Sequence, residues 1–303
     1  MNYKYEGETI RLDKLFREFF YPSRSELKKV IDSKEVFVNG KLAKASLEVN
    51  TGDIIELPIY NEFSFRKITQ DINVLYEDDY YIALDKPKNF LVHPAKSSKE
   101  LSLVEFLITN NFPLSDGEDA LRPGVIHRLD KETTGIVIFA KTNNSHELMK
   151  KMFSDRKISK RYICIVSGDL KGSREIKNYI TRDDTKIKMK VANFGKEAIT
   201  LVDPIDSDGF YSLLDVKILT GRTHQIRVSL ADIGFPIVGD DLYGNIKNNK
   251  LCDRQMLHSY SLEFDHPITN EKISIVSKLP NDFKDCIKKI GFKKINPEGF
   301  ILL

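Results

Sequence analysis

Residues 122–135, RPGVIHRLDKETTG, form the densest cluster of polar side chains in the chain, and they directly precede the aliphatic run from Ile136 to Phe139. A loop that abuts a buried strand can hold catalytic groups rigidly while solvent still reaches them. Asp130 in this loop could act as a nucleophile, a general base or a metal ligand. Alternatively, it caps the following turn while Arg128 pairs with Glu132 on the surface, and spacing alone favours this structural interpretation.

A second cluster, TGRTHQIR, occupies residues 220–227. If a helix begins here with Thr223 as its N-cap, His224 and Arg227 lie three residues apart on one face. The other face then packs against the core through Ile226, Leu230 and Ile233. The free amides of the first turn could bind a phosphate. On the structural interpretation, the arginines are exposed and His224 is a partly buried, hydrogen-bonded histidine.

Motifs for metals and nucleotide cofactors are missing from the sequence. The six histidines form no HxH or HExxH pair, and there is no P-loop and no GxGxxG. The three cysteines, Cys164, Cys252 and Cys286, are widely separated and form no CxxC. We therefore expect no metal, no nucleotide cofactor, no cysteine zinc site and no disulfide scaffold.

Length and composition indicate a folded protein with more than one domain. The chain has 303 residues, of which 41% are hydrophobic and 30% charged, so a sizeable core can form and two domains are expected. No apolar run approaches the roughly 18 residues that span a bilayer. The charged N-terminal residues do not resemble a signal peptide. We expect no membrane segment and a cytoplasmic location.

Positive charge is concentrated in one stretch of the chain. The whole sequence carries a net charge of +3, whereas residues 141–190 contain 14 Lys or Arg residues and 6 Asp or Glu residues, a net charge of +8. The remainder is therefore net acidic, at −5. Such a block is either a phosphate-facing surface or a solvated lysine-rich face, and charge alone does not separate the two.

The N-terminal residues have the pattern of a small separate domain. The predicted elements are a helix over 12–19 that ends before Pro22, a second helix with a capping box from Ser23 and Glu26, and strands at 36–38 and 54–57 with turns at Asn39-Gly40 and Gly52-Asp53. We place this α/β domain at residues 1–60. Residues 61–71 lack periodicity and are the predicted linker.

Residues 72–303 form the larger predicted domain, which contains both polar clusters. Strands are predicted at 73–76, 81–84, 135–140, 161–166 and 211–219, and helices at 103–109, 145–153 and 223–233. Strands dominate and do not alternate regularly with helices. We therefore expect an α+β fold with a mixed, mainly antiparallel sheet rather than a doubly wound one.

Five segments in this domain, between residues 71 and 283, resemble the RluA/RluD branch of the RNA pseudouridine synthases. In order they are YEDDYYIALDKP with a following His-Pro, HRLDKETTG, SKRYICIVSG, TGRTHQIRVSLADIGFPIVGDDLYG and RQMLHSYSLEFDHP. Each alone is weak, but the five in order are specific. The N-terminal domain is similar to the ribosomal S-four-type RNA-binding domain through SRSELKKVIDSKEVFVNGK and VNTGDIIEL.

The sequence departs from the family pattern at a few positions. Thr134 stands where serine is common, Ser229 where histidine often follows the arginine, Asn89-Phe90 replaces the usual small-residue turn, and Lys34-Glu35 replaces a glycine of the first domain. None of these departures removes a reacting group.

The resemblance implies a pseudouridine synthase fold with a central active-site cleft, which isomerises uridine to pseudouridine in structured RNA without metal or cofactor. Asp130 matches the catalytic aspartate, whose attack on either the ribose or the uracil ring stays open. Tyr162 matches the active-site tyrosine that stacks on the target base. Arg227 matches the basic residue paired with the aspartate, and Arg128 the arginine that fills the gap left by the extruded uridine.

The neighbours of these residues complete the predicted site. His127 is expected to share the RNA-contacting, base-flipping role of Arg128, while Thr223, His224 and Ile226 support the substrate pocket. The expected partner is structured RNA, with large-subunit ribosomal RNA favoured and transfer RNA as the alternative, and a monomer is favoured. A non-catalytic RNA-binding protein and an aspartate-dependent glycosidase are other classes; the intact catalytic set argues against the first, and no second carboxylate is evident for the other.

Overall fold

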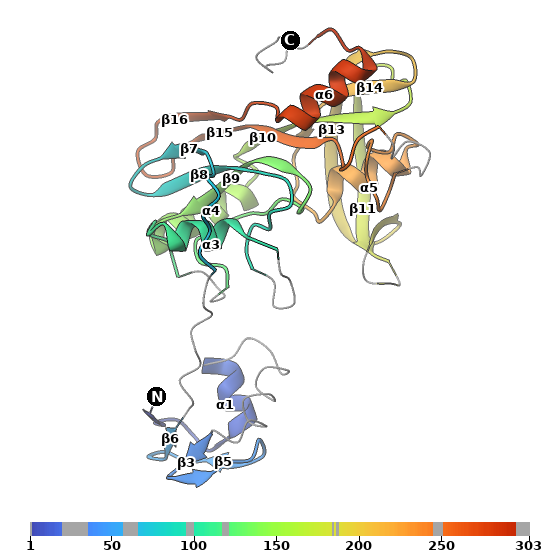
Figure 1. Ribbon diagram of the computed structural model, residues 1–303. Coiled ribbons are helices and arrows are strands. Elements are labelled where there is room, and N and C mark those ends of the chain that lie inside the picture. Colours follow the sequence, from blue (N-terminus) through green and yellow to red (C-terminus); the bar gives the residue numbers. More distant parts are fainter. Residues whose placement is uncertain are drawn as a thin grey trace. The chain divides into compact units, whose positions relative to one another are not determined.

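The computed structural model describes residues 2–19, 36–56, 66–94, 100–116, 121–183, 185, 188–244 and 251–294. The chain divides into two compact units, Met1–Ser64 and Phe65–Leu303 (Figure 1). The helix predicted after Ser23 and part of the predicted linker lie outside the described residues. No helix in the part of the chain that is described is long and apolar enough to cross a membrane.

The first unit combines one described helix with short antiparallel strands. Its elements are β1 (Asn2–Lys4), β2 (Ile10–Arg11), α1 (Leu12–Phe19), β3 (Phe37–Val38), β4 (Lys41–Leu42), β5 (Glu48–Val49) and β6 (Ile54–Glu56). The turn between β3 and β4 has positive φ at Asn39 (51°) and Gly40 (72°), as a type I′ hairpin turn requires. Leu12, Leu15 and Ile55 belong to a core that this unit forms on its own. The first helix, the strands and the turns predicted here are confirmed.

The second unit is built on a mixed sheet of ten strands. They are β7 (Val74–Glu77), β8 (Tyr81–Lys86), β9 (Thr134–Ala140), β10 (Ser159–Ser167), β11 (Arg174–Arg182), β12 (Met189–Ala192), β13 (Lys196–Ser207), β14 (Tyr211–Ile218), β15 (Leu257–Asp265) and β16 (Lys272–Val276). The spatial order is β12-β11-β13-β14-β10-β15-β9-β8-β7, with β16 also paired to β15. Among these strands only β15 and β9 pair in parallel. The predicted α+β fold is confirmed.

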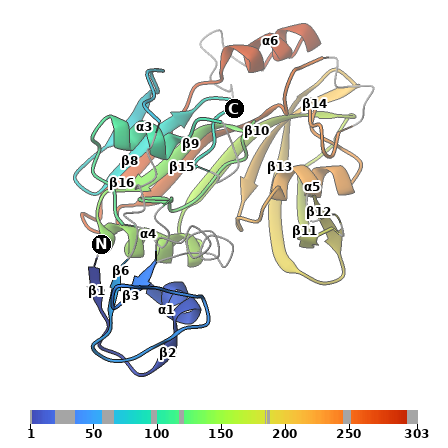
Figure 2. The same ribbon diagram turned by 60° about the horizontal axis from the view of Figure 1, so that its bottom comes forward.

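Four helices of the described chain cover the two faces of this sheet: α3 (Leu103–Thr109), α4 (Asn143–Ser154), α5 (Gln225–Asp232) and α6 (Asn281–Ile290). α3 and α5 pack on one face, over a continuous core that includes Phe139 and Ile226. α4 and α6 pack on the opposite face, over cores that contain Met149 and Phe283. Figure 2 shows α5 beside β11, β12 and β13. The predicted site residues lie on the α5 side of the sheet.

Thr223 does not cap α5, so that prediction is wrong. The helix begins at Gln225, and the residue before it, His224, has a left-handed φ of 53° and no capping side-chain bond. The cause is the Gln225 side chain, whose Oε1 accepts the Arg222 N–H (3.0 Å) and the Thr220 hydroxyl (2.8 Å). These bonds hold the preceding residues as a loop instead of a first helical turn.

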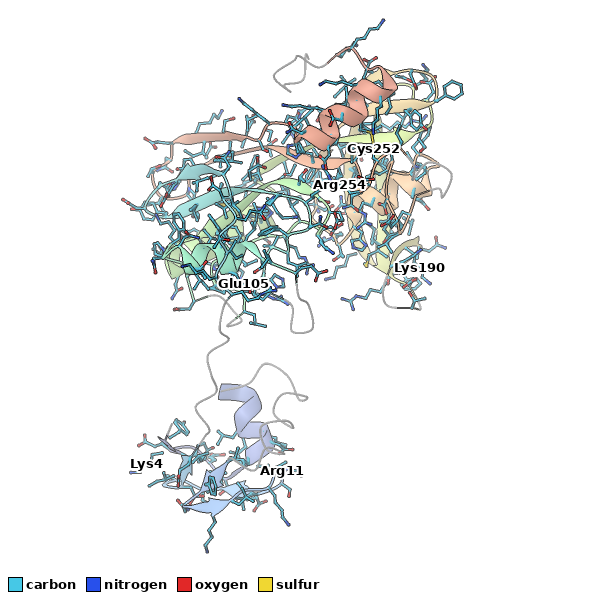
Figure 3. The ribbon with its side chains drawn as sticks, in the orientation of Figure 1. Lys4, Arg11, Glu105, Lys190, Cys252 and Arg254 are labelled. Atoms are coloured by element: carbon cyan, nitrogen blue, oxygen red, sulfur yellow. A yellow bond between two sulfur atoms is a disulfide. The ribbon has the colours of Figure 1, made fainter. Side chains whose placement is uncertain are left out.

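Two of the three cysteines are paired. Cys252, which is labelled in Figure 3, forms a disulfide with Cys286, 34 residues later in the sequence, whereas Cys164 is free and buried. This single disulfide was not predicted, since the cysteine pattern only argued against a disulfide scaffold. Sequence spacing could not show it, because the pairing depends on α6 packing against the segment that precedes β15.

Candidate active site

Asp130 lies in a tight turn immediately before β9. The Thr133 N–H donates to the Asp130 carbonyl (3.1 Å) and closes this turn. Three buried side chains also bond to this turn. Lys86 Nζ donates to the carbonyl of the residue that follows Asp130 (2.7 Å), and Arg254 Nη1 donates to the carbonyl of the residue that precedes Thr133 (3.0 Å). Gln255 Nε2 donates to the Thr133 hydroxyl (2.7 Å). The backbone that carries Asp130 is therefore anchored on three sides before any substrate binds.

The strand that supports this turn needs a glycine at one position. All seven residues of β9 are buried, and Gly135 has a φ of 108°. A Cβ atom at this position would lie 2.1 Å from the carbonyl oxygen of Ser259 in β15. Only glycine tolerates both the positive φ and this close approach. Gly135 therefore allows the parallel pairing of β9 and β15 next to the turn.

Arg227 joins the Asp130 carboxylate to a second carboxylate. Its Nη1 donates to Asp130 Oδ2 (2.8 Å), while Nε and Nη2 donate to both oxygens of Asp240 (2.7 and 2.9 Å). Asp240 is fully buried, and Arg227 is only 6% exposed. Burial opposes ionisation of Arg227, but its bonds to Asp240 and Asp130 raise its pKa. Arg227 is thus a permanent cation beside Asp130, as the family resemblance implies.

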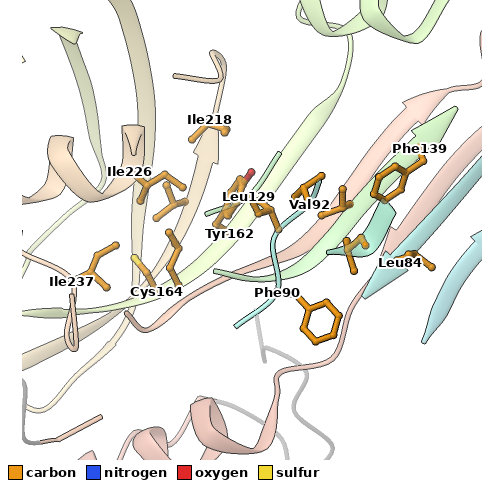
Figure 4. Packing of buried hydrophobic residues seen from close by; sticks show 14 of the residues in the cluster. Leu84, Phe90, Val92, Leu129, Phe139, Tyr162, Cys164, Ile218, Ile226 and Ile237 are labelled. Carbon is orange, nitrogen blue, oxygen red and sulfur yellow. The ribbon is translucent and has the colours of Figure 1, made fainter. Parts of the chain in front are cut away.

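Tyr162 comes from β10, at a point where the sheet is irregular. The register between β10 and β15 shifts between Arg161 and Tyr162, and bulges of this kind often redirect a side chain near an active site. Figure 4 shows Tyr162 next to Leu129 and between the side chains of Ile226 and Val92. Burial raises the pKa of the Tyr162 hydroxyl to about 12. The phenol is therefore protonated at neutral pH.

His224 faces the other oxygen of the Asp130 carboxylate, with Nε2 3.8 Å from Oδ1. Its Nδ1 lies 2.9 Å from the Tyr243 hydroxyl, which accepts the N–H of Met189 (2.7 Å). The Tyr243 proton is then free to be donated to Nδ1, which leaves the histidine proton on Nε2. Burial lowers the pKa of His224. A neutral ring therefore presents an N–H group beside Asp130.

These groups surround a cavity of about 440 Å³, a size that suits a small ligand or a single nucleotide unit. All eight residues predicted for the site line it: His127, Arg128, Asp130, Tyr162, Thr223, His224, Ile226 and Arg227. Within the described residues there is no group of three or more His, Cys, Asp or Glu side chains that could hold a metal ion. The cavity thus offers a carboxylate, two fixed hydrogen-bond donors and an aromatic ring.

Residues 80–232 match the family model of RNA pseudouridylate synthases, and residues 10–55 match that of the ribosomal S-four-type domain. An RNA pseudouridine synthase of Aquifex aeolicus is 36% identical over 94% of this chain and 95% of its own length. The chain belongs to the RNA pseudouridine synthase family. It is therefore an RNA-modifying isomerase, and RNA is its partner.

Other comparisons agree with this membership. Ribosomal large subunit pseudouridine synthase D of Vibrio cholerae is 32% identical to the chain over 90% of it and 88% of its own length. Human RNA pseudouridylate synthase domain containing 1 shares the fold, with a TM-score of 0.60 at 21% identity, over 73% of this chain and 89% of its own. The pseudouridine synthase fold is thus confirmed by structural likeness.

His127 occupies a different setting in the synthase from the one that its position beside Arg128 suggests. Its Nε2 accepts the backbone N–H of Ile138 in β9 (3.1 Å), and its ring stacks on Phe153 at a centroid distance of 5.0 Å. Burial lowers its pKa to about 3. His127 is therefore a neutral part of the cavity wall, whereas Arg128 is exposed.

The synthase also contains site residues that carried no predicted role. Asp240 and Tyr243 lie in the segment VGDDLYG, which the family resemblance covers, yet nothing in their spacing pairs them with Arg227 and His224. Lys160 lines the cavity two residues before Tyr162. Its position two residues before Tyr162 in the same strand was the available signal, because alternate residues of a strand share a face.

Proposed function

We propose that the enzyme isomerises specific uridines of large-subunit ribosomal RNA, with Asp130 as the catalytic residue. The observation that carries this proposal is the Asp130–Arg227 pair, a carboxylate and a fixed cation 2.8 Å apart at the wall of a nucleotide-sized cavity. The choice of RNA follows the relatives, such as the Vibrio cholerae protein that is named a ribosomal large subunit synthase.

Isomerisation conserves every atom of the nucleotide, so the protein must only manage charge and orientation. The bond from ribose to the ring nitrogen breaks, uracil turns over, and ring carbon five bonds to the ribose. Carbon five then loses its proton, and the released nitrogen gains one. Asp130 can stabilise the separated fragments either by a covalent bond or by its charge. Arg227 holds the carboxylate in place during this turnover.

The remaining residues bind the extruded nucleotide. Tyr162 provides an aromatic face on which uracil stacks, and Ile226 adds an apolar contact on the same side of the cavity. His224 and the exposed Thr223 offer polar contacts to the sugar. Arg128 is exposed at the cavity and fills the space that the flipped base leaves, which offsets part of the few kcal/mol that base flipping costs.

The N-terminal unit selects the RNA in this proposal. We place the recognition domain at residues 1–60, a linker at 61–71 and the catalytic domain at 72–303. The S-four-type match at residues 10–55 supports RNA binding by the first domain. We further propose that the enzyme acts as a monomer in the cytoplasm.

The test is release of tritium from RNA labelled at carbon five of uracil, because only formation of the new bond expels that atom. Large-subunit ribosomal RNA and bulk transfer RNA serve as parallel substrates. Release from ribosomal RNA, at a uridine located by pseudouridine mapping, supports the proposal. Release from transfer RNA alone would overturn the choice of substrate, and no release from either would overturn the activity.

A further inference from the structure

Three cations that line the cavity have no carboxylate partner among the described residues: Arg128, Lys160 and Arg222. The other charged groups at the cavity are committed, since Asp130 is paired with Arg227 and Arg227 also with Asp240. The lining of the cavity thus carries positive charge that no carboxylate of the described residues balances. A negatively charged ligand would balance it.

Lys160 is the most informative of the three because it is buried. It is only 8% exposed, and lysine is almost never buried without a partner. Its Nζ lies over the ring of Phe153, 5.2 Å from the centroid. Burial and the charge of Arg222 lower its pKa to about 8. Packing on an aromatic ring offsets only part of the cost of burying this cation.

Arg222 is held beside Lys160 with donors to spare. Its Nε donates to the carbonyl of Glu197 (2.9 Å), which fixes the guanidinium against β13. Within the described residues no acceptor is recorded for its two Nη groups. A planar guanidinium and a point-charged ammonium that converge on one cavity are the usual protein ligands of a phosphate.

We propose that Lys160 and Arg222 form a subsite for one phosphodiester group adjoining the target uridine. This inference rests on the proposed function, because it assigns the ligand of the same cavity. The position of Lys160 in β10 supports this subsite. Lys160 lies two residues before Tyr162, the side chain on which the base stacks in the proposed function. A nucleotide with its base on Tyr162 would therefore place a flanking phosphate near Lys160.

The test combines a protein change with a single neutral linkage in the RNA. A hairpin RNA with the mapped uridine is made with normal linkages, or with one methylphosphonate on the 5′ side or on the 3′ side of that uridine. Affinity and single-turnover rate are measured for the wild type and for Lys160→Met. One neutral linkage should weaken wild-type binding by about tenfold or more. Lys160→Met should weaken binding of normal RNA by a similar factor. The neutral linkage that weakens wild-type binding should cause no further loss of affinity in this variant.

Lys289→Met is the matched control, because it removes the same charge from an exposed position on α6. Each methylphosphonate linkage should lower the RNA affinity of this control by the same factor as in the wild type. If Lys160→Met responds to both neutral linkages as the wild type does, the subsite is overturned. It is also overturned if this variant binds normally and only its single-turnover rate falls, since Lys160 would then act in the chemical steps.

Failure of the proposed function would look different. If the wild type converts no uridine in any RNA, the activity is refuted but the subsite can still be measured with mononucleotides. The probes are uridine, uridine 3′-monophosphate and uridine 5′-monophosphate. One phosphate should improve wild-type affinity by about tenfold, and Lys160→Met should abolish that gain. Equal gains in the two proteins would overturn the subsite.

Discussion

Arg227 is shared between two carboxylates with different tasks. Asp240 is buried, receives two of the three hydrogen bonds, and also accepts the N–H groups of Leu242 and Tyr243 (2.9 and 3.0 Å). Asp130 receives one hydrogen bond and keeps its other oxygen toward the cavity. Asp240 therefore fixes the guanidinium, and the guanidinium fixes the Asp130 carboxylate, which we propose as the catalytic group. One oxygen of Asp130 is therefore fixed by Arg227, while the other can contact a substrate in the cavity.

Asp130→Asn should reduce the single-turnover rate at saturating enzyme by at least about a thousandfold. Asparagine keeps the shape and can still accept a hydrogen bond from Arg227, but it has no negative charge and is not a nucleophile. RNA affinity and thermal stability should stay close to the wild type. A residual rate above a tenth of wild type would refute the assignment of Asp130 as the catalytic residue.

Arg227→Ala should lower both turnover and stability. It leaves Asp240 buried without its cation, and breaking such a pair costs about 3–5 kcal/mol. Arg227→Lys should recover part of each loss, because an ammonium restores the charge but cannot bond to two carboxylates in the same planar geometry. Chemical unfolding and single-turnover rates measure the two effects.

Asp240→Asn is the matched variant for this pair. It keeps the positive charge of Arg227 but removes the carboxylate that orients the guanidinium. Turnover should therefore fall, while RNA affinity should stay unchanged. A wild-type single-turnover rate for Arg227→Ala would refute the pairing as a functional one. A loss that appears only in salt-sensitive RNA affinity would instead assign Arg227 to phosphate contact.

At the scale of elements, the site is formed where a turn, a strand and a helix end meet. The turn before β9 supplies Asp130, β10 supplies Tyr162 at its bulge, and the start of α5 supplies His224 and Arg227. Lys86 from β8 and Arg254 from the segment before β15 bond to the same turn. Elements that are far apart in sequence thus fix a single carboxylate.

Local patterns predicted the elements better than they predicted these contacts. The aliphatic run of β9 suffices to predict a strand, whereas the cation near Asp130 was expected from the family resemblance. By contrast, the N-cap of α5 depends on the side chain of Gln225, and the partner of Arg227 is a carboxylate 13 residues away. The strands β11, β12, β13, β15 and β16 and helix α6 were not predicted, because most are defined by pairing across the sheet.

The disulfide ties α6 to the segment that carries Arg254. Cys252 and Cys286 are linked, and Asp282 of α6 accepts two hydrogen bonds from Arg254 (2.8 and 3.0 Å). Closing a loop of this length stabilises a protein by about 3–4 kcal/mol on the chain-entropy model. Cys286→Ser should therefore lower the free energy of unfolding under non-reducing conditions.

Reducing agent provides the control for this prediction. It should bring the wild type down to the stability of Cys286→Ser and leave the variant unchanged. Thiol titration after unfolding without reductant should find one free thiol, from Cys164, among the three cysteines. Three free thiols would contradict the disulfide in the isolated protein.

At the scale of the whole molecule, the two units have separate cores. The first is closed by residues of its own sheet and α1, and the second contains the cavity and every residue of the proposed site. In the proposed function, chemistry and selection of the RNA therefore belong to separate units. The S-four-type match in the first unit and the synthase match in the second follow the same division.

Deletion of residues 1–64 should weaken binding to the full RNA substrate by roughly tenfold or more, because a tethered second contact multiplies affinity through its effective concentration. The single-turnover rate on a short hairpin that carries only the target uridine should remain within about twofold of the full-length enzyme, since the deletion removes no group of the cavity. Binding curves at two salt concentrations should also show a smaller salt dependence for the shortened protein, because fewer phosphates are contacted.

The two substrates serve as controls for each other: a fall in rate on the hairpin would show that the first unit supports the catalytic unit itself. Unchanged affinity and unchanged site choice on the full RNA would refute its role in recognition.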